Sequence, residues 1–159
     1  MKKIALVSFS LLFLAVCFAT EGFPAGNEKE FQKVKKMDIR ELMSATQDLM
    51  EKKYPNENWD TYKFPKFVYI HRAVTLGYKI AVKDPELLAS FPCYCLCDAM
   101  GHRNLLYCFV EKGAVGGNFD EHASTCNICI TEAMRGFLWK ELGAPEAEML
   151  KALKEIYGQ

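Results

Sequence analysis

Six cysteines and two histidines are crowded into one short stretch of this 159-residue chain, and both residue types bind metal ions. They follow the pattern Cys-x-Cys-x-Cys-x4-His-x5-Cys, then thirteen residues, then His-x3-Cys-x2-Cys. Thiolate sulfur and neutral imidazole nitrogen together prefer soft or borderline cations such as Cu(I) and Zn²⁺. Eight such ligands suffice for two tetrahedral zinc sites or for a small Cu(I)–thiolate cluster. The predicted metal ligands are Cys93, Cys95, Cys97, His102, Cys108, His122, Cys126 and Cys129.

The local backbone would allow these side chains to converge. If the segment that carries the first three cysteines is extended, alternate side chains face the same way and present three sulfurs on one side. Cys126 and Cys129 are spaced three apart at an expected helix start, where free N–H groups and the helix dipole lower the pKa of a thiol. The sequence thus predicts thiolate ligands from one extended segment and from one helix N-terminus.

Two other chemistries are compatible with the same cysteines. Six cysteines can pair into three disulfides, with fifteen possible connectivities. Against this pairing, same-face Cα atoms two residues apart in a strand lie about 6.5 to 7 Å apart, near the upper limit for a disulfide. Disulfides would also leave both histidines without a role.

A thiol-disulfide oxidoreductase, with Cys126 or a Cys-x-Cys sulfur as nucleophile, needs one low-pKa thiol and one resolving partner, so most of the six cysteines would be superfluous. We therefore expect a non-catalytic metal site. A thiol-disulfide oxidoreductase and a disulfide-stapled structural or interaction domain are the two alternative hypotheses.

The N-terminus has the three parts of a secretory signal peptide. Two lysines precede an apolar run from Ile4 to Phe18, and the small residue Ala19 follows. The run is too short for a comfortable membrane span. We expect residues 1–19 to be removed on export to the periplasm or the cell exterior. A lipoprotein signal, with Cys17 as the anchored residue, is the alternative.

Composition limits the remaining function classes. Removal of the expected signal peptide leaves 18 basic and 20 acidic side chains, a formal charge of −2. A chain with this charge has no excess of basic residues that would attract nucleic acid. No later stretch approaches the roughly 20 apolar residues that a spanning helix needs, so we expect no transmembrane segment in the mature chain. Because 50% of the residues are hydrophobic, one ordinary core can form without disulfides. The partner that the sequence predicts is a metal ion.

The hydrophobic periodicity predicts a mainly α-helical fold with few strands. Residues 20–37 are polar and contain glycine and proline, so we expect a flexible lead-in before a single helical domain over 38–159. Asp38 and Glu41 are spaced as a capping box for the first helix, and His71 falls on the apolar stripe of the second, where it is expected to lie in the core. The expected helices are 39–53, 65–83, 85–90, 104–110, one from Ser124 or Thr125 to Leu142, and one from Pro145 onward.

The residues around the cysteines resemble a known family. Within residues 78–139 the matching elements are Pro92 to Cys97, Gly101-His102, Leu105-Leu106, Cys108-Phe109, His122, Cys126 to Cys129 and Glu132-Ala133. This pattern is similar to that of exported bacterial proteins named for a Cys-Tyr-Cys-x-Cys motif, close to those described by Pro-Cys-Tyr-Cys-Gly-Cys. Leu96 stands where one branch has glycine. Some relatives are thought to use selenocysteine in the motif, so the resemblance implies thiols that act as a unit. It implies no particular activity and no particular metal.

Overall fold

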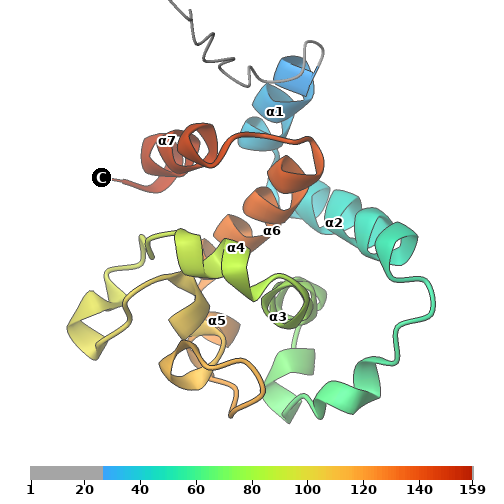
Figure 1. Cartoon of the computed structure of the whole chain (residues 1–159), viewed down its shortest axis with the longest axis vertical. Coiled ribbons are helices and arrows are strands. Elements are labelled where there is room, and N and C mark those ends of the chain that lie inside the picture. Colours follow the sequence, from blue (N-terminus) through green and yellow to red (C-terminus); the bar gives the residue numbers. More distant parts are fainter. Residues whose placement is uncertain (1–26, 159) are drawn as a thin grey trace, which may run out of the picture.

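The computed structural model describes residues 27–158, which fold into α-helices and short 3₁₀ helices (Figure 1). The predicted mainly helical class is confirmed: this range holds no β-strand, only an isolated antiparallel bridge between Val110 and Phe119. The expected signal peptide, residues 1–19, lies outside the described residues. The α-helices are α1 (Asn27–Lys36), α2 (Ile39–Lys53), α3 (Arg72–Lys83), α4 (Pro85–Ser90), α5 (His122–Thr125), α6 (Asn127–Glu141) and α7 (Glu146–Tyr157). The 3₁₀ helices are Trp59–Tyr62, Lys66–Tyr69, Cys97–Met100, Leu105–Cys108 and Glu111–Gly113.

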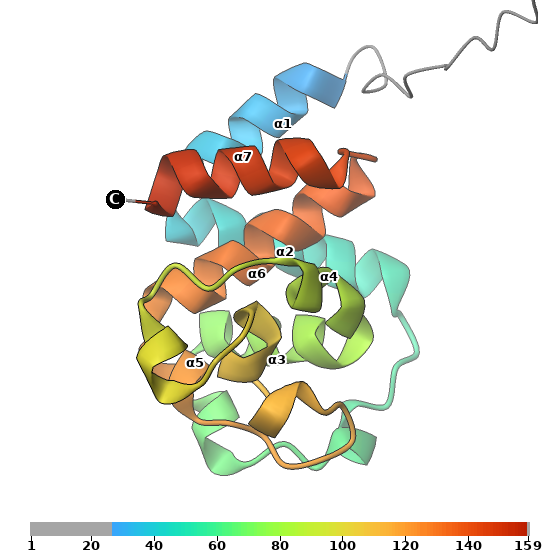
Figure 2. The same ribbon diagram turned by 60° about the vertical axis from the view of Figure 1, so that its left-hand side comes forward.

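Helix α6 is the central element of the fold. Most of its residues are buried, and it packs against each of the other α-helices in the described range. Figures 1 and 2 show α6 in the middle of the molecule, with α1 and α7 toward one end and α3, α4 and α5 toward the other. A helix that is buried on nearly all sides belongs to the core rather than to the surface. None of the described helices has the length and apolar character needed to cross a membrane.

The flexible lead-in expected over residues 20–37 is wrong for residues 27–36, which form α1. Phe31 and Val34 are buried, and the Phe31 ring stacks on Trp139 of α6 with 4.8 Å between ring centroids. The indole N–H of Trp139 also donates a hydrogen bond to the Phe31 carbonyl, at 3.1 Å. Only two side chains of this otherwise charged helix are buried and apolar, and so small an apolar stripe is easily mistaken for solvated coil.

Helix α2 has the predicted bounds, and its predicted capping box is confirmed. One carboxylate oxygen of Asp38 accepts hydrogen bonds from the backbone N–H groups of Arg40 and Glu41, at 2.8 and 2.9 Å. The Glu41 side chain in turn accepts from the Asp38 backbone N–H at 2.8 Å. These bonds satisfy N–H groups that the first turn of a helix leaves unpaired, so a local sequence signal sets where α2 begins.

The helix expected over 65–83 is wrong in its first third. A 3₁₀ turn occupies Lys66–Tyr69, and α3 begins only at Arg72. His71 is the N-cap residue in an extended conformation and is exposed, so it is not the core histidine that the periodicity predicted. The Thr75 hydroxyl donates to the Val68 carbonyl at 2.8 Å, which satisfies a backbone group that a continuous helix would have paired internally.

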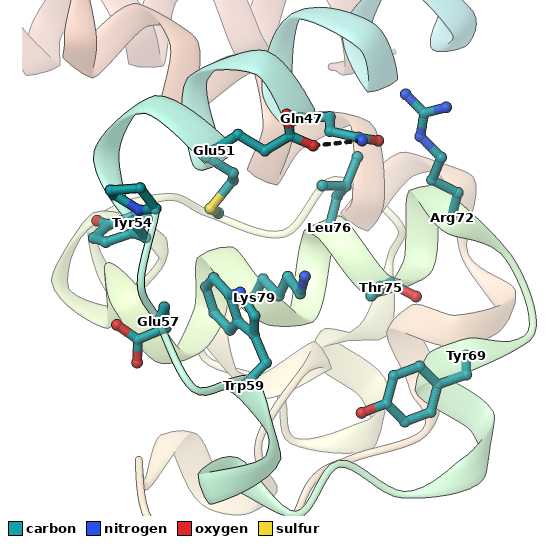
Figure 3. A pocket seen from close by; sticks show the side chains of 12 residues that line it. Gln47, Glu51, Tyr54, Glu57, Trp59, Tyr69, Arg72, Thr75, Leu76 and Lys79 are labelled. Atoms are coloured by element: carbon teal, nitrogen blue, oxygen red, sulfur yellow. Dashed lines mark hydrogen bonds between the residues drawn. The ribbon is translucent and has the colours of Figure 1, made fainter.

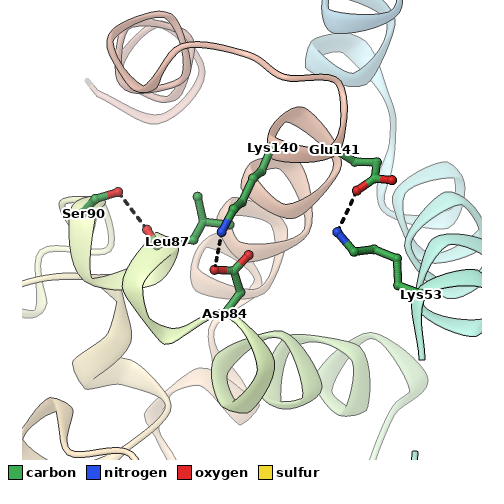
Figure 4. A network of polar contacts seen from close by, with 6 residues as sticks. All are labelled: Lys53, Asp84, Leu87, Ser90, Lys140 and Glu141. Carbon is green, nitrogen blue, oxygen red and sulfur yellow. Dashed lines mark hydrogen bonds and ion pairs between the residues drawn. The ribbon is translucent and has the colours of Figure 1, made fainter. Parts of the chain in front are cut away.

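The C-terminal end of α6 is tied to the rest of the molecule by two ion pairs (Figure 4). Lys140 pairs with Asp84 at the α3–α4 junction, and Lys53 at the end of α2 pairs with Glu141, each at 2.7 Å. Partly exposed pairs of this kind contribute about 0 to 1 kcal/mol each. Burial of α6 rather than these pairs therefore stabilises the arrangement.

At Gly136, α6 packs closely against the segment that leads into the cysteines. A Cβ atom at this position would lie 2.1 Å from the Phe91 ring, which is fully buried. The Phe91 carbonyl accepts a hydrogen bond from the Leu105 N–H at 2.9 Å, which brings together the two ends of the loop over residues 91–105. The absence of a side chain at residue 136 thus fixes where this loop starts.

We predict that Gly136→Ala destabilises the protein by about 1–3 kcal/mol, because overpacking against Phe91 outweighs the better helix propensity of alanine. Urea denaturation of the reduced protein measures the effect. The double variant with Phe91→Leu supplies the control, since removal of the ring should make the alanine substitution much less harmful. A single variant as stable as the wild type would contradict the close packing.

Candidate metal centre

The sulfur atoms of cysteines from separate parts of the chain meet at one place. The Sγ atom of Cys93 lies 3.1 Å from that of Cys95, 3.0 Å from Cys97, 3.3 Å from Cys108 and 3.8 Å from Cys129. The six cysteines of the described range are free thiols, and these separations are well above the roughly 2.05 Å of a disulfide bond. Thiolates around a tetrahedral zinc ion lie about 3.8 Å apart, as follows from Zn–S bonds of about 2.3 Å. The distances between these sulfurs are therefore equal to, or slightly shorter than, those between thiolates that bind the same ion.

Three groups of four ligand atoms are compact enough to hold a metal ion, and within each group all atoms lie within 4.8 Å of one another. Seven of the eight predicted ligands take part in them. The first group is Cys93, Cys95, Cys108 and Cys129; the second is Cys95, Cys97, Cys108 and His122; the third is Cys95, His122, Cys126 and Cys129. The described residues thus contain a Cys/His cluster that is compatible with metal binding.

The two histidines occupy different positions in this cluster. His122 Nε2 lies 3.2 Å from the Cys95 sulfur, and His122 belongs to two of the three groups. His102 Nδ1 lies 3.4 Å from the Cys108 sulfur but belongs to none of them. The two imidazole rings meet edge to face, with 5.1 Å between centroids. His102 is therefore at the edge of the cluster.

The extended segment expected at the first three cysteines is wrong: the chain turns there. Residues 94–95 form a turn, and Cys97 begins a 3₁₀ helix. Leu96 has a φ of +62°, in the left-handed region that L-residues other than glycine rarely adopt. A pleated strand would hold alternate side chains about 6.5 to 7 Å apart along the chain. The turn instead brings the sulfurs of Cys93 and Cys97 to 3.0 Å.

A break between α5 and α6 presents the next two cysteines. The expected cap at Ser124 or Thr125 is wrong: Cys126 is the N-cap residue of α6, with extended backbone angles, and Cys129 lies in the first turn. The Cys129 thiol lowers the pKa of Cys126 to about 5 by hydrogen bonding, and the free backbone N–H groups at the start of the helix add to this. The predicted pair of cysteines at a helix N-terminus is therefore confirmed, although the helix starts later.

His122 is held in place from α3. Its backbone N–H donates to a carboxylate oxygen of Asp120 at 2.8 Å. The Tyr78 hydroxyl of α3 donates to the Asp120 backbone carbonyl at 2.5 Å, and the Tyr78 side chain is fully buried. A buried aromatic residue of the core thus fixes the loop that carries a candidate ligand.

The thiols in this cluster do not share one protonation state. Hydrogen bonds from Cys108 and Cys129 lower the pKa of Cys93, whereas burial raises the pKa of Cys95 and that of Cys97. Without a cation, such a crowded site favours few thiolates, each stabilised by hydrogen bonds from protonated neighbours. Ionisation of all six requires a positive charge among them.

Glu132 is a residue of the site that the sequence analysis did not assign. Its side chain is fully buried, and one oxygen accepts a hydrogen bond from the Tyr94 N–H at 3.4 Å. The other oxygen has no hydrogen-bond partner among the described residues. Burial raises the pKa of Glu132 to about 9, and the nearby Cys93 adds to this effect. The position three residues after Cys129, on the same face of a helix, was the signal that could have found it.

A separate cavity of about 760 Å³ lies between α2, α3 and the segment that joins them (Figure 3). Its wall includes Trp59, Arg72 and Lys79, and none of the predicted metal ligands lines it. The Lys79 ammonium lies 4.4 Å from the centroid of the Trp59 ring, so this charge already has a cation–π partner. The reactive side chains of the described chain are concentrated in the Cys/His cluster instead.

The fold and the cluster define a mainly helical, cysteine-rich protein whose thiols converge in the core. A family model described as "Protein of unknown function with PCYCGC motif" matches residues 8–159, so the chain belongs to this family. The resemblance inferred from the cysteine pattern is thereby confirmed. Comparisons with curated proteins and with solved structures gave no match. In this chain the motif reads Pro-Cys-Tyr-Cys-Leu-Cys, with Leu96 at the glycine position.

The left-handed conformation of Leu96 explains why a glycine suits this position of the motif. We predict that Leu96→Gly stabilises the reduced protein by about 0.5–1 kcal/mol, because glycine avoids the strain of the left-handed region. Little packing is lost, since the Leu96 side chain is 84% exposed. Urea denaturation tests this, with Leu96→Ala as the control that keeps a Cβ atom and should show no gain. A destabilised glycine variant would argue against the turn.

Glu132 should make the fold less stable as the pH rises. Its pKa is about 9 in the folded protein against an ordinary value of 4.5, so its protonated form favours folding. This contribution is complete below about pH 4.5 and is lost as the pH rises toward 9. We expect Glu132→Gln to remove a slope of up to about 1.4 kcal/mol per pH unit from the unfolding free energy in this window. Glu148→Gln, at an exposed position, is the control and should keep the slope of the wild type. If the unfolding free energy of the wild type and of both variants changes equally with pH, the raised pKa of Glu132 is contradicted.

Proposed function

We propose that this chain is an exported protein that binds a soft metal ion, Cu(I) or Zn²⁺, without catalysing a reaction. One observation carries the proposal: sulfur and imidazole atoms from four chain segments form three groups whose atoms lie within 4.8 Å. The proposed ligands are Cys93, Cys95, Cys97, Cys108, Cys126 and Cys129, with His122 beside them and His102 at the edge.

Charge supports a cation at this place. Cys97, Cys108 and Cys129 are buried, and the other three cysteines are half-buried. Neighbouring cysteines and burial raise the pKa of Cys129, so its surroundings oppose its ionisation. Several thiolates cannot be buried together without a compensating positive charge. A bound metal ion supplies that charge and displaces the thiol protons as it binds.

The ligand types support a soft ion. The three groups contain only sulfur and imidazole nitrogen, with no carboxylate oxygen among their atoms. Hard cations such as Mg²⁺ and Ca²⁺ prefer oxygen ligands, whereas thiolates select Cu(I) and zinc. Export is proposed from the signal-like pattern of residues 1–19. In an oxidising compartment a bound metal would also protect neighbouring thiols from disulfide formation.

A thiol-disulfide oxidoreductase is the second candidate, and one observation favours it. Cys126 is half-buried at the N-terminus of α6 and has a pKa of about 5, as an attacking thiol requires. The same site, however, surrounds this sulfur with Cys95, Cys129 and His122 within ligand distance of one another. An enzyme of this class needs only two of the six thiols.

We predict that the mature protein, purified under reducing conditions, contains Cu(I) or zinc by elemental analysis and loses it to a strong chelator. Single Cys→Ser variants at the six positions should each weaken metal affinity, by roughly 10- to 100-fold, because each removes one ligand or its neighbour in the cluster. A competition titration with a chromogenic chelator measures these affinities.

His71→Ala is the matched control, because His71 is exposed and lies outside the three groups. It should leave metal affinity unchanged. Native mass spectrometry of the protein purified without reductant, together with an activity assay, tests the contrary outcomes. A metal-free protein with three disulfides would refute the proposal, and so would disulfide reductase activity that disappears only in the Cys126→Ser variant while metal binding is absent throughout the series.

A further inference from the structure

The three ligand groups of the cluster overlap in a particular way. Every two of them share two residues, and Cys95 belongs to all three. The first and second groups share Cys95 and Cys108, and the first and third share Cys95 and Cys129. Two independent tetrahedral zinc sites would need two groups with no common member. The described residues offer no such pair of groups, so more than one ion can bind only if some ligands are shared.

Sulfur and nitrogen differ in whether they can be shared. A thiolate sulfur has several lone pairs and can bridge two or three metal ions, whereas a neutral imidazole nitrogen has one lone pair and binds one ion. The second and third groups share His122 as well as Cys95. When His122 binds the ion of the second group, the third group is left with Cys95, Cys126 and Cys129. That remaining set is three sulfurs.

A set of three sulfurs distinguishes the two candidate metals. Zinc in structural protein sites is almost always four-coordinate. Cu(I) has a filled d shell and is stable with two or three thiolates, and soft sulfur ligands favour it. We propose, on the basis of the metal-binding function argued above, that the cluster is a polynuclear, thiolate-bridged Cu(I) centre in which Cys95 is the common bridging ligand. It accommodates up to three copper ions.

The position of Cys95 fits this role. Its sulfur lies 3.1 Å from Cys93, 3.6 Å from Cys129 and 3.2 Å from the His122 ring nitrogen, so it meets ligand atoms of its own loop and of two other chain segments. The next residue, Leu96, is 84% exposed, which places the bridging cysteine directly behind the surface of the molecule. Cys97, Cys108 and Cys129 are buried behind it. Copper therefore enters from the side of Cys95, Cys126 and His122, all of which are half-buried.

The binding step involves no electron transfer. Each thiol that becomes a ligand forms a sulfur–copper bond and releases its proton to solvent, and the copper stays in the +1 state. Copper must therefore be supplied as Cu(I). In the experiment the full mature chain, reduced and anaerobic, is titrated with a Cu(I) chelate, and bound copper is counted by native mass spectrometry. X-ray absorption of the loaded protein then detects whether copper ions lie next to one another.

We expect the wild type to bind two or three Cu(I) ions, with clear copper–copper scattering and few partly loaded molecules. Cys97→Ser is the matched control for Cys95→Ser, because it lies on the same loop but belongs to one group only. It should retain at least two ions and the copper–copper signal. Cys95→Ser should bind at least one ion fewer than Cys97→Ser and give a weaker copper–copper signal, because Cys108 and Cys129 are then the sulfurs that the groups still share. Circular dichroism checks that both variants retain their helices.

The outcomes separate this inference from the proposed function. One Cu(I) per chain without copper–copper scattering, or equal losses in the two variants, would overturn the shared centre and leave metal binding intact. Two zinc ions per chain, bound more tightly than Cu(I), would overturn it as well. Absence of any bound metal would overturn the proposed function itself. If Cys95→Ser does not fold, ion number and scattering in the wild type still decide between a shared and a single-ion site.

Discussion

The proximity of six thiols in one partly buried place is the constraint on which the rest of this structure depends. Sulfurs as close as 3.0 Å cannot all carry a negative charge without a cation between them. Without one, the cluster holds few thiolates, surrounded by protonated neighbours. In an oxidising environment, these metal-free thiols would form disulfides. A soft metal that binds the sulfur atoms protects them from this oxidation.

Helix α6 connects this cluster to the core. Its first turn carries Cys129, the next turn carries Glu132, and the following turn carries Gly136, against which Phe91 packs. Trp139 near the other end joins α6 to α1. One buried helix therefore positions ligands at its start, contacts the loop that supplies the other ligands at its middle, and is anchored at its end. Displacement of α6 would move both halves of the ligand set relative to each other.

The buried carboxyl of Glu132 lies beside the cluster, and the charge of Cys93 affects its pKa. It accepts a hydrogen bond from the Tyr94 N–H, between two of the ligand cysteines, and has no charged partner within ion-pair distance in the described range. A neutral carboxyl adds no negative charge to a site that already contains several thiol groups. Ionised, it would repel the thiolates. Its protonation is thus coupled to the charge of the cluster.

The sequence by itself determined the local and compositional features of this protein. The capping box at Asp38 set the start of α2, apolar periodicity gave the helical class, and the spacing of cysteines and histidines identified the residues that converge. Each of these features can be recognised from residue types and their spacing along the chain. Only the tertiary structure decided which sulfurs are neighbours, because Cys93 and Cys129 are 36 residues apart and meet through packing of α6. The turn at Leu96, the docking of α1 and the burial of Glu132 likewise depend on contacts between distant segments, which periodicity along the chain does not record.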